Sequence, residues 1–189
     1  MDVIIVMKHN LFRNFSTQLE LPECLLNYDF NKGKKLQSCL ASTKIDTKIR
    51  NCNHYYLSDD DRKIVDPILS DTINWCNHDM YRYLITNLEE PAIIVYEKGE
   101  FYTWHMDSHQ DPDIGHERKL SFTLQLSDPD EYEGGELEFR DHVTGEIRQA
   151  PKEKGVITIF HSDIIHRVKE VTKGTRKALV GWALGPPWK

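Results

Sequence analysis

The second half of the chain is divided into short apolar stretches by closely spaced turn signals. Glycine-containing pairs mark four of these turns, Gly134-Gly135, Thr144-Gly145, Lys154-Gly155 and Lys173-Gly174. Short apolar stretches between such turns are typical of β-strands. The sequence predicts eight strands, at Ala92–Glu97, Phe101–Trp104, Lys119–Leu126, Glu136–Arg140, Glu146–Gln149, Val156–Phe160, Ile165–Val171 and Arg176–Leu184. This spacing favours an antiparallel sandwich or jelly roll over a βαβ arrangement.

The first half is mixed, and its clearest element is a helix from Asp59 to Asp79. Ser58 precedes it as an N-cap, with Asp61 in the capping-box position. Because proline disrupts a helix interior, we expect a break before Pro67, with Asp66 as a second N-cap. The face predicted to pack on a sheet comprises Ile68, Thr72, Trp75 and Cys76.

Length and composition indicate a globular protein. A chain of 189 residues with 39% hydrophobic and 29% charged residues is long enough for one domain with a substantial core. We expect a single domain over residues 1–189, mainly β with supporting helices. Residues 1–91 would supply helices and strands that pack on one sheet, and residues 92–184 would form the jelly-roll core.

Charge and cysteine usage narrow the partners and the compartment. A formal charge of −6 argues against sequence-independent binding of nucleic acid, and no stretch is long enough to span a membrane. The four cysteines form no C-x-x-C pair, so we expect reduced thiols in a cytoplasmic protein. The apolar start lacks a basic leader and a cleavage site, so we expect a strand there.

His105 and Asp107 form the first candidate metal-binding pair. Residues two apart in an extended strand point to the same side, so both side chains can face one ion. Nine histidines and thirty acidic residues make a chance H-x-D pattern common, so this pair alone is a weak signal.

His166 is the candidate third ligand, because it begins a predicted strand that can lie beside the His105 strand in a closed double sheet. Two imidazoles and one carboxylate on one face of an ion form the facial triad of non-haem Fe(II) oxygenases. Zinc is also chemically compatible with this set, and a core histidine without a metal is the simpler alternative. His109, His116, His142 and His161 are interpreted as solvated loop residues.

Arg176 opens the last predicted strand, ten positions after His166. Its alternation with Ala178, Val180 and Trp182 places them on one face. A permanently charged, planar guanidinium there is suited to a carboxylate. The alternative is an ion pair at the rim with a residue such as Glu170.

Several motifs together resemble a known family. They are the run from Tyr96 to Asp107, Leu-Ser-Phe-Thr-Leu-Gln-Leu-Ser-Asp-Pro-Asp from Leu120, Tyr-Glu-Gly-Gly-Glu-Leu from Tyr132, His-Arg-Val from His166 and Gly-Thr-Arg ending at Arg176. Residues 92–184 thereby resemble the prolyl 4-hydroxylase-like branch of the 2-oxoglutarate/Fe(II) oxygenases. The Leu-Ser-Asp-Pro-Asp and Glu-Gly-Gly-Glu-Leu segments are most similar to bacterial PKHD-type hydroxylases.

The resemblance implies a double-stranded β-helix (a cupin-like jelly roll) in which His105, Asp107 and His166 bind Fe(II). It also implies that 2-oxoglutarate chelates the iron, with Arg176 paired to its distal carboxylate. Tyr96 stands where the family places a tyrosine that hydrogen-bonds 2-oxoglutarate. Gln125 stands where relatives often carry a second tyrosine near the same carboxylate of 2-oxoglutarate. This is a departure from the family pattern, although the amide can still donate a hydrogen bond to that carboxylate.

The implied reaction uses O2, converts 2-oxoglutarate to succinate and CO2 and hydroxylates a substrate, with ascorbate as a further reductant. The carboxylate of Asp107 favours hydroxylation, because related halogenases replace it with a small residue. Tyr102 and Trp182 stand where prolyl hydroxylases present aromatic side chains, which favours a prolyl residue of a protein or peptide. Oxidation of a nucleobase or small metabolite, and a catalytically silent binding module, are the alternatives.

Overall fold

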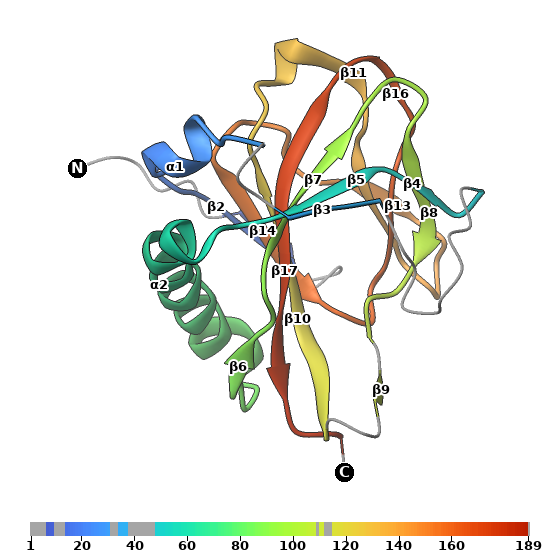
Figure 1. The fold of residues 1–189 in the computed structure, drawn as a ribbon. Coiled ribbons are helices and arrows are strands. Elements are labelled where there is room, and N and C mark those ends of the chain that lie inside the picture. Colours follow the sequence, from blue (N-terminus) through green and yellow to red (C-terminus); the bar gives the residue numbers. More distant parts are fainter. Residues whose placement is uncertain are drawn as a thin grey trace.

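Two antiparallel sheets face each other in the computed structural model, which describes residues 7–9, 14–30, 34–37, 48–108, 110–111 and 115–188 (Figure 1). The larger sheet has the strand order β1 (Met7–His9), β2 (Asn14–Gln18), β14 (Val156–His161), β10 (His116–Gln125), β17 (Arg176–Gly185), β7 (Ala92–Tyr96), β5 (Asn53–Tyr56) and β3 (Lys34–Gln37). Two short strands, β6 (Asn87–Leu88) and β9 (Gln110–Asp111), pair with β17 and β10.

The smaller sheet has five strands among the described residues. Its order is β13 (Ile147–Gln149), β12 (Leu137–Arg140), β15 (Ile165–Val168), β8 (Phe101–His105) and β4 (Arg50–Asn51). A separate pair consists of β11 (Tyr132–Gly134) and β16 (Val171–Gly174). The predicted jelly roll, a double-stranded β-helix with N-terminal helices on one sheet, is confirmed.

Two apolar cores lie on opposite faces of the larger sheet. Strand β7 is buried along its whole length, with Ile93 and Val95 in one core and Ala92, Ile94 and Tyr96 in the other. The first core lies under the helices, and the second lies between the two sheets, where Leu137 and Phe139 of β12 also pack. A strand covered on both faces carries a continuous apolar run, as β7 does.

The helices are α1 (Glu23–Leu26), α2 (Asp59–Cys76), a π-helical turn (Asn77–Tyr81) and a 3-10 turn (Pro129–Glu131). Figure 1 shows α1 and α2 against the larger sheet, on the side away from β4 and β8. The Ser58 hydroxyl caps α2 by accepting a hydrogen bond from the Asp61 N–H, as predicted.

The predicted break at Pro67 is wrong, because α2 continues through it. Pro67 lies on the exposed side of the helix, where water can satisfy the carbonyl that loses its partner. Asp66 accepts a hydrogen bond from Arg62 instead of acting as a cap. The predicted packing face is also shifted, since the buried residues are Val65, Leu69, Ile73 and Cys76, whereas Trp75 is 48% exposed.

The predicted strands of the second half correspond to observed ones, with one division. The stretch Ile165–Val171 is split, because β15 ends at Val168 and β16 begins at Val171 to pair with β11. Of the predicted N-terminal strand, only β1 lies within the described residues. No helix among these residues is long and apolar enough to span a membrane. No disulfide joins the cysteines that the structure describes, Cys24, Cys52 and Cys76.

Candidate active site

The structure brings His105, Asp107 and His166 together between the two sheets. His105 ends β8, and His166 in β15 is its direct partner in the antiparallel register. Asp107 follows two residues after His105. Its Oδ1 lies 3.6 Å from His105 Nε2, and its Oδ2 lies 3.4 Å from His166 Nε2. All three ligand atoms lie within 4.8 Å of one another, as one metal ion would require.

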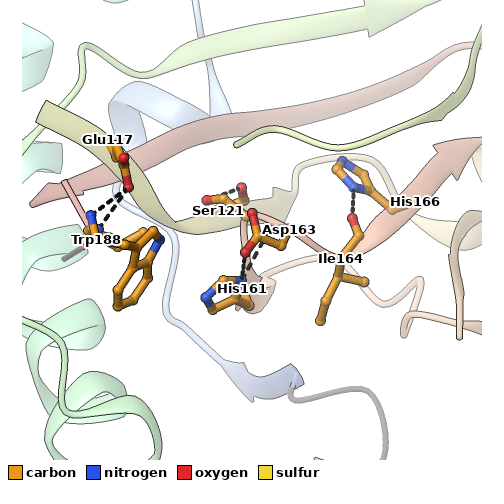
Figure 2. A network of polar contacts seen from close by, with 9 residues as sticks. Glu117, Ser121, His161, Asp163, Ile164, His166 and Trp188 are labelled. Atoms are coloured by element: carbon orange, nitrogen blue, oxygen red, sulfur yellow. Dashed lines mark hydrogen bonds and ion pairs between the residues drawn. The ribbon is translucent and has the colours of Figure 1, made fainter. Parts of the chain in front are cut away.

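Backbone carbonyls determine which nitrogen of each imidazole is protonated. His105 Nδ1 lies 2.7 Å from the Thr103 carbonyl. His166 Nδ1 lies 2.8 Å from the Ile164 carbonyl, as Figure 2 shows for this pair. Because a carbonyl oxygen only accepts, each Nδ1 carries the proton and donates it. In a neutral ring, Nε2 then presents a lone pair toward Asp107, which is the tautomer that binds metals.

Protonation of these groups follows from their surroundings. Burial, together with the neighbouring His166, lowers the pKa of His105 and favours its neutral form. Burial alone would raise the pKa of Asp107, but the adjacent His166 and His105 hold it well below its ordinary value. Asp107 is therefore ionised, and when both rings are neutral with Nδ1 protonated, two Nε2 lone pairs and a carboxylate face one point, an arrangement that suits a cation.

A buried serine holds the backbone at Asp107. The Ser162 carbonyl accepts hydrogen bonds from the N–H groups of Asp107 and Ser108, at 2.9 and 3.0 Å. The Ser162 hydroxyl lies 3.0 Å from that of Ser121 in β10, so the carboxylate is anchored to the larger sheet.

Arg176 is 1% exposed and lies opposite Tyr96 in the register of β17 with β7. Its Nη2 donates to Gln125 Oε1 at 3.1 Å, and its Nε has no hydrogen-bond partner. No ion pair joins Arg176 to a carboxylate of the described residues, so the alternative of a salt bridge with Glu170 is not observed. A buried guanidinium without a carboxylate is costly, which fits a site for an anion.

The turn that contains Gly135 lies against the Arg176 side chain. Gly135 has φ +63°, and a Cβ there would lie 3.0 Å from Arg176 Cδ. Tyr132, just before this turn, has a buried hydroxyl without a hydrogen-bond partner. Burial raises the pKa of Tyr132, and nearby Arg176 partly offsets this. Tyr132 was not predicted as a site residue, although it begins one of the quoted motifs.

A cavity of about 370 Å³ lies between the metal-site residues and the aromatic side chains of Tyr102 and Trp182. His105, Asp107, His166, Tyr96, Tyr102 and Trp182 all line it, whereas Arg176 and Gln125 are not among its lining residues. Burial raises the pKa of Tyr96, so its hydroxyl stays protonated and can donate. The cavity therefore joins six of the eight predicted site residues.

Comparisons with known proteins agree with this geometry. The sequence profile of the 2OG-Fe(II) oxygenase superfamily matches residues 91–184. A PKHD-type hydroxylase from Prochlorococcus marinus is 46% identical over 85 residues, which cover 45% of this chain and 37% of the relative. Another from Idiomarina loihiensis is 42% identical over 87 residues, covering 46% and 38%. Residues 91–184 belong to the 2OG-Fe(II) oxygenase superfamily.

The matches span less than half the length of these two PKHD-type hydroxylases. The structural likeness, in contrast, extends beyond residues 91–184 of this chain. A prolyl-4-hydroxylase from Pseudomonas putida has a TM-score of 0.71 at 18% identity, over 91% of this chain and 92% of the other. A viral collagen prolyl hydroxylase from Paramecium bursaria Chlorella virus-1 has a TM-score of 0.66 at 17% identity, over 92% and 96%. These likenesses show the same fold.

Other side chains cover the rings of Trp182 and Tyr102, the two aromatic residues predicted to contact the substrate. The Arg118 guanidinium lies 3.7 Å from the Trp182 ring centroid and is held by two hydrogen bonds to Glu89. The Trp182 Nε1 is buried without a hydrogen-bond partner. Tyr102 is stacked on His105, with ring centroids 3.5 Å apart. Contacts of Tyr102 and Trp182 with a substrate stay predictions.

Several polar residues of the cavity wall were not predicted from the sequence, among them Arg50 and His54. His54 is 9% exposed, and its Nε2 has no hydrogen-bond partner. Burial and the nearby Arg50 lower the pKa of His54 to about 3. No strand was predicted at these positions, so no alternation pattern indicated which side chains face inward.

His161 is not the solvated loop residue that was predicted. It ends β14 with a side chain 13% exposed, and its ring lies near that of Tyr83. The Trp188 ring also lies near it (Figure 2). The stacked Trp188 ring, with its centroid 5.9 Å from that of His161, partly covers it. His142 is exposed in a turn and His116 is exposed at the start of β10, while His109 lies outside the described residues.

Proposed function

We propose that this chain is an Fe(II)- and 2-oxoglutarate-dependent dioxygenase that hydroxylates a prolyl residue of a protein or peptide. One observation carries the cofactor assignment: His105 Nε2, His166 Nε2 and the Asp107 carboxylate converge as three acceptors, with both Nδ1 atoms bound to carbonyls. The superfamily match supports iron and 2-oxoglutarate in particular over zinc.

The proposed roles follow the positions of the side chains. His105, Asp107 and His166 would hold the iron, which supplies activation of O2 coupled to oxidative decarboxylation of 2-oxoglutarate to succinate and CO2. Arg176 would pair with the distal carboxylate of 2-oxoglutarate, because its guanidinium is buried without an anion. The Tyr96 hydroxyl would donate a hydrogen bond to 2-oxoglutarate. Gln125 would orient the Arg176 guanidinium by accepting its hydrogen bond.

The substrate assignment rests on the aromatic residues Tyr102 and Trp182 of the cavity and on the structural relatives. Trp182 and Tyr102 line the cavity beside the metal-site residues. Because both faces of the Tyr102 ring are covered, its edge and the Trp182 ring would contact the apolar prolyl ring. One of these relatives, with a TM-score of 0.67 at 21% identity, is a prolyl hydroxylase from Trichoplax adhaerens in complex with a hypoxia inducible factor peptide fragment. A cytoplasmic location and ascorbate as reductant belong to the same proposal.

The test is oxygen incorporation into a set of proline-containing peptides. Purified protein with Fe(II), 2-oxoglutarate and O2 is expected to add one oxygen to a prolyl residue, measured by tandem mass spectrometry, with an equivalent amount of succinate. Peptides with alanine in place of proline, and the Asp107→Ala protein, should show neither product.

Two other results would redirect the proposal. Oxidation of nucleosides or small metabolites in the same assay, with no peptide modified, would overturn the prolyl assignment and keep the oxygenase. Absence of succinate under all conditions, together with absence of 2-oxoglutarate binding, would indicate a catalytically silent module.

A further inference from the structure

A bulge in β8 brings the side chains of Tyr102 and His105 to the same side of the strand. His105 pairs with His166, whereas Tyr102 pairs with Val168, so an interval of three residues in β8 faces an interval of two in β15. Without the extra residue, positions three apart would point to opposite faces. Bulges commonly redirect a side chain next to an active site.

The Tyr102 ring lies between the His105 imidazole and the Arg50 guanidinium. The Tyr102 and His105 rings are nearly parallel, at an angle of 16° and with centroids 3.5 Å apart. The Arg50 guanidinium carbon lies 4.5 Å from the Tyr102 centroid. Because the His105 imidazole lies on one face of the Tyr102 ring at van der Waals distance, the Arg50 guanidinium covers the other face of that ring.

Arg50 is held in this position by the N-terminal half of the chain. Strand β4 pairs with β8 so that Arg50 lies directly opposite Tyr102. The Arg50 Nε also donates to the Cys52 Sγ at 3.3 Å. The cation is therefore fixed over the ring from a strand outside residues 91–184, the segment that matches the superfamily profile.

The two histidines of the metal site differ in what restrains them. The His166 ring packs on the buried Phe160 and Phe139, at centroid distances of 4.8 and 6.3 Å. The His105 ring contacts no phenylalanine ring among the described residues, and its parallel contact is Tyr102 alone. Besides the Thr103 carbonyl, the Asp107 carboxylate and the tilted His166 ring, the contact that orients His105 is the stacked ring of Tyr102.

We propose that Arg50 and Tyr102 are positioning residues that hold the His105 imidazole in the orientation that binds the metal. The inference rests on the proposed function, because it assumes that His105 is a metal ligand. Cation–π attraction keeps the tyrosine ring flat against Arg50, and ring stacking transmits this restraint to the imidazole. Residues behind a metal ligand typically change metal affinity by about 10- to 100-fold when removed.

Binding of Co(II), a redox-stable probe, measured by calorimetry and by its visible absorption spectrum, tests this role without turnover. Arg50→Met and Tyr102→Leu are each expected to weaken Co(II) binding by about tenfold or more and to alter the spectrum. Tyr102→Phe keeps the ring and should stay within about threefold of the unsubstituted protein. Arg50→Lys keeps the cation and should lie between Arg50→Met and the unsubstituted protein.

Arg167→Met is the matched control, because the Arg167 guanidinium lies 4.4 Å from the ring of Trp104, also in β8, and neither residue lines the cavity. It should leave Co(II) affinity unchanged even where it lowers thermal stability. Unchanged Co(II) affinity and spectrum in folded Arg50→Met and Tyr102→Leu would overturn the inference. Failure of the unsubstituted protein to bind Co(II) would instead contradict the proposed function.

Discussion

Arg176 donates a hydrogen bond from Nη2 to the Oε1 of Gln125, 3.1 Å away in the buried interior. Gln125 pairs with Ala178 in the register of β10 with β17, so it lies diagonally opposite Arg176. The amide orients the guanidinium but does not neutralise it. No acidic side chain of the described residues pairs with the Arg176 guanidinium. Its positive charge is therefore available to the carboxylate of a ligand.

Gln125→Glu should have opposite effects on stability and on ligand binding. A carboxylate at this position would pair with Arg176, so we expect the free energy of unfolding in urea to stay equal or rise. The same carboxylate would compete with the distal carboxylate of 2-oxoglutarate and weaken its binding by about tenfold or more, as calorimetry would measure. Equal 2-oxoglutarate affinity in Gln125→Glu and the unsubstituted protein would show that Arg176 does not bind the co-substrate.

Metal binding should stabilise the fold through the three converging ligands. A ligand that binds only the folded state, at about 100 times its Kd, adds about 2.7 kcal/mol. Saturating Co(II) should therefore raise the Tm of the unsubstituted protein by several degrees, and a chelator should reverse the shift. Asp107→Ala should show no shift, and a shift equal to that of the unsubstituted protein would exclude Asp107 as a ligand.

Stability should fall at mildly acidic pH because of His54. Its pKa is lowered from 6.5 to about 3 in the folded state by burial and by Arg50, so the folded protein favours the neutral ring. The stabilisation is present above pH 6.5 and is lost as the pH falls toward 3, with a loss of about 2 kcal/mol between pH 7 and pH 5.

His54→Gln should remove this part of the pH dependence. Urea unfolding of both proteins at pH 7 and pH 5, with a chelator present, gives the comparison. We expect the stability difference between the two pH values to be smaller in His54→Gln by about 2 kcal/mol. The same difference in both proteins would mean that His54 is protonated in the folded state.

Helix α2 should contribute to stability through its observed face and not through the face predicted from the sequence. Leu69 is 1% exposed in the core between α2 and the larger sheet, so Leu69→Ala should cost about 2–5 kcal/mol in urea unfolding. Ile64 lies in α2 four residues before Ile68 of the predicted face and is 51% exposed, and Ile64→Ala should change stability by about 0.5 kcal/mol or less. Equal losses in both variants would contradict this packing.

Local pattern predicted the strands of the second half well, because each turn signal there marks a chain reversal regardless of tertiary contacts, but it did not predict β2 to β5. It failed at Pro67, where exposure of that side of the helix lets water replace the missing hydrogen bond. It also failed at the outward-facing Trp75, because the direction of packing depends on the sheet beneath α2.

The ligand residues of the candidate site could likewise be predicted from local sequence patterns, whereas the residues that hold them could not. His105 and Asp107 were visible as a spacing, and His166 and Arg176 as positions on later strands. The partners that hold these residues come from distant segments: Arg50 from β4, and Ser162 just after β14. No local pattern predicts the bulge in β8 that aligns Tyr102 with His105, because it arises from pairing with β15.

Anaerobic titration of 2-oxoglutarate into the Fe(II)-loaded protein tests the central claim most directly. Chelation of Fe(II) by 2-oxoglutarate should produce a metal-to-ligand charge-transfer absorption band that saturates at one equivalent. The band should be absent in His105→Ala, and Arg176→Lys should require about 10- to 100-fold more 2-oxoglutarate, because lysine lacks the planar fork. Absence of the band in folded, Fe(II)-loaded unsubstituted protein would contradict the assignment of this chain as a 2-oxoglutarate-dependent oxygenase.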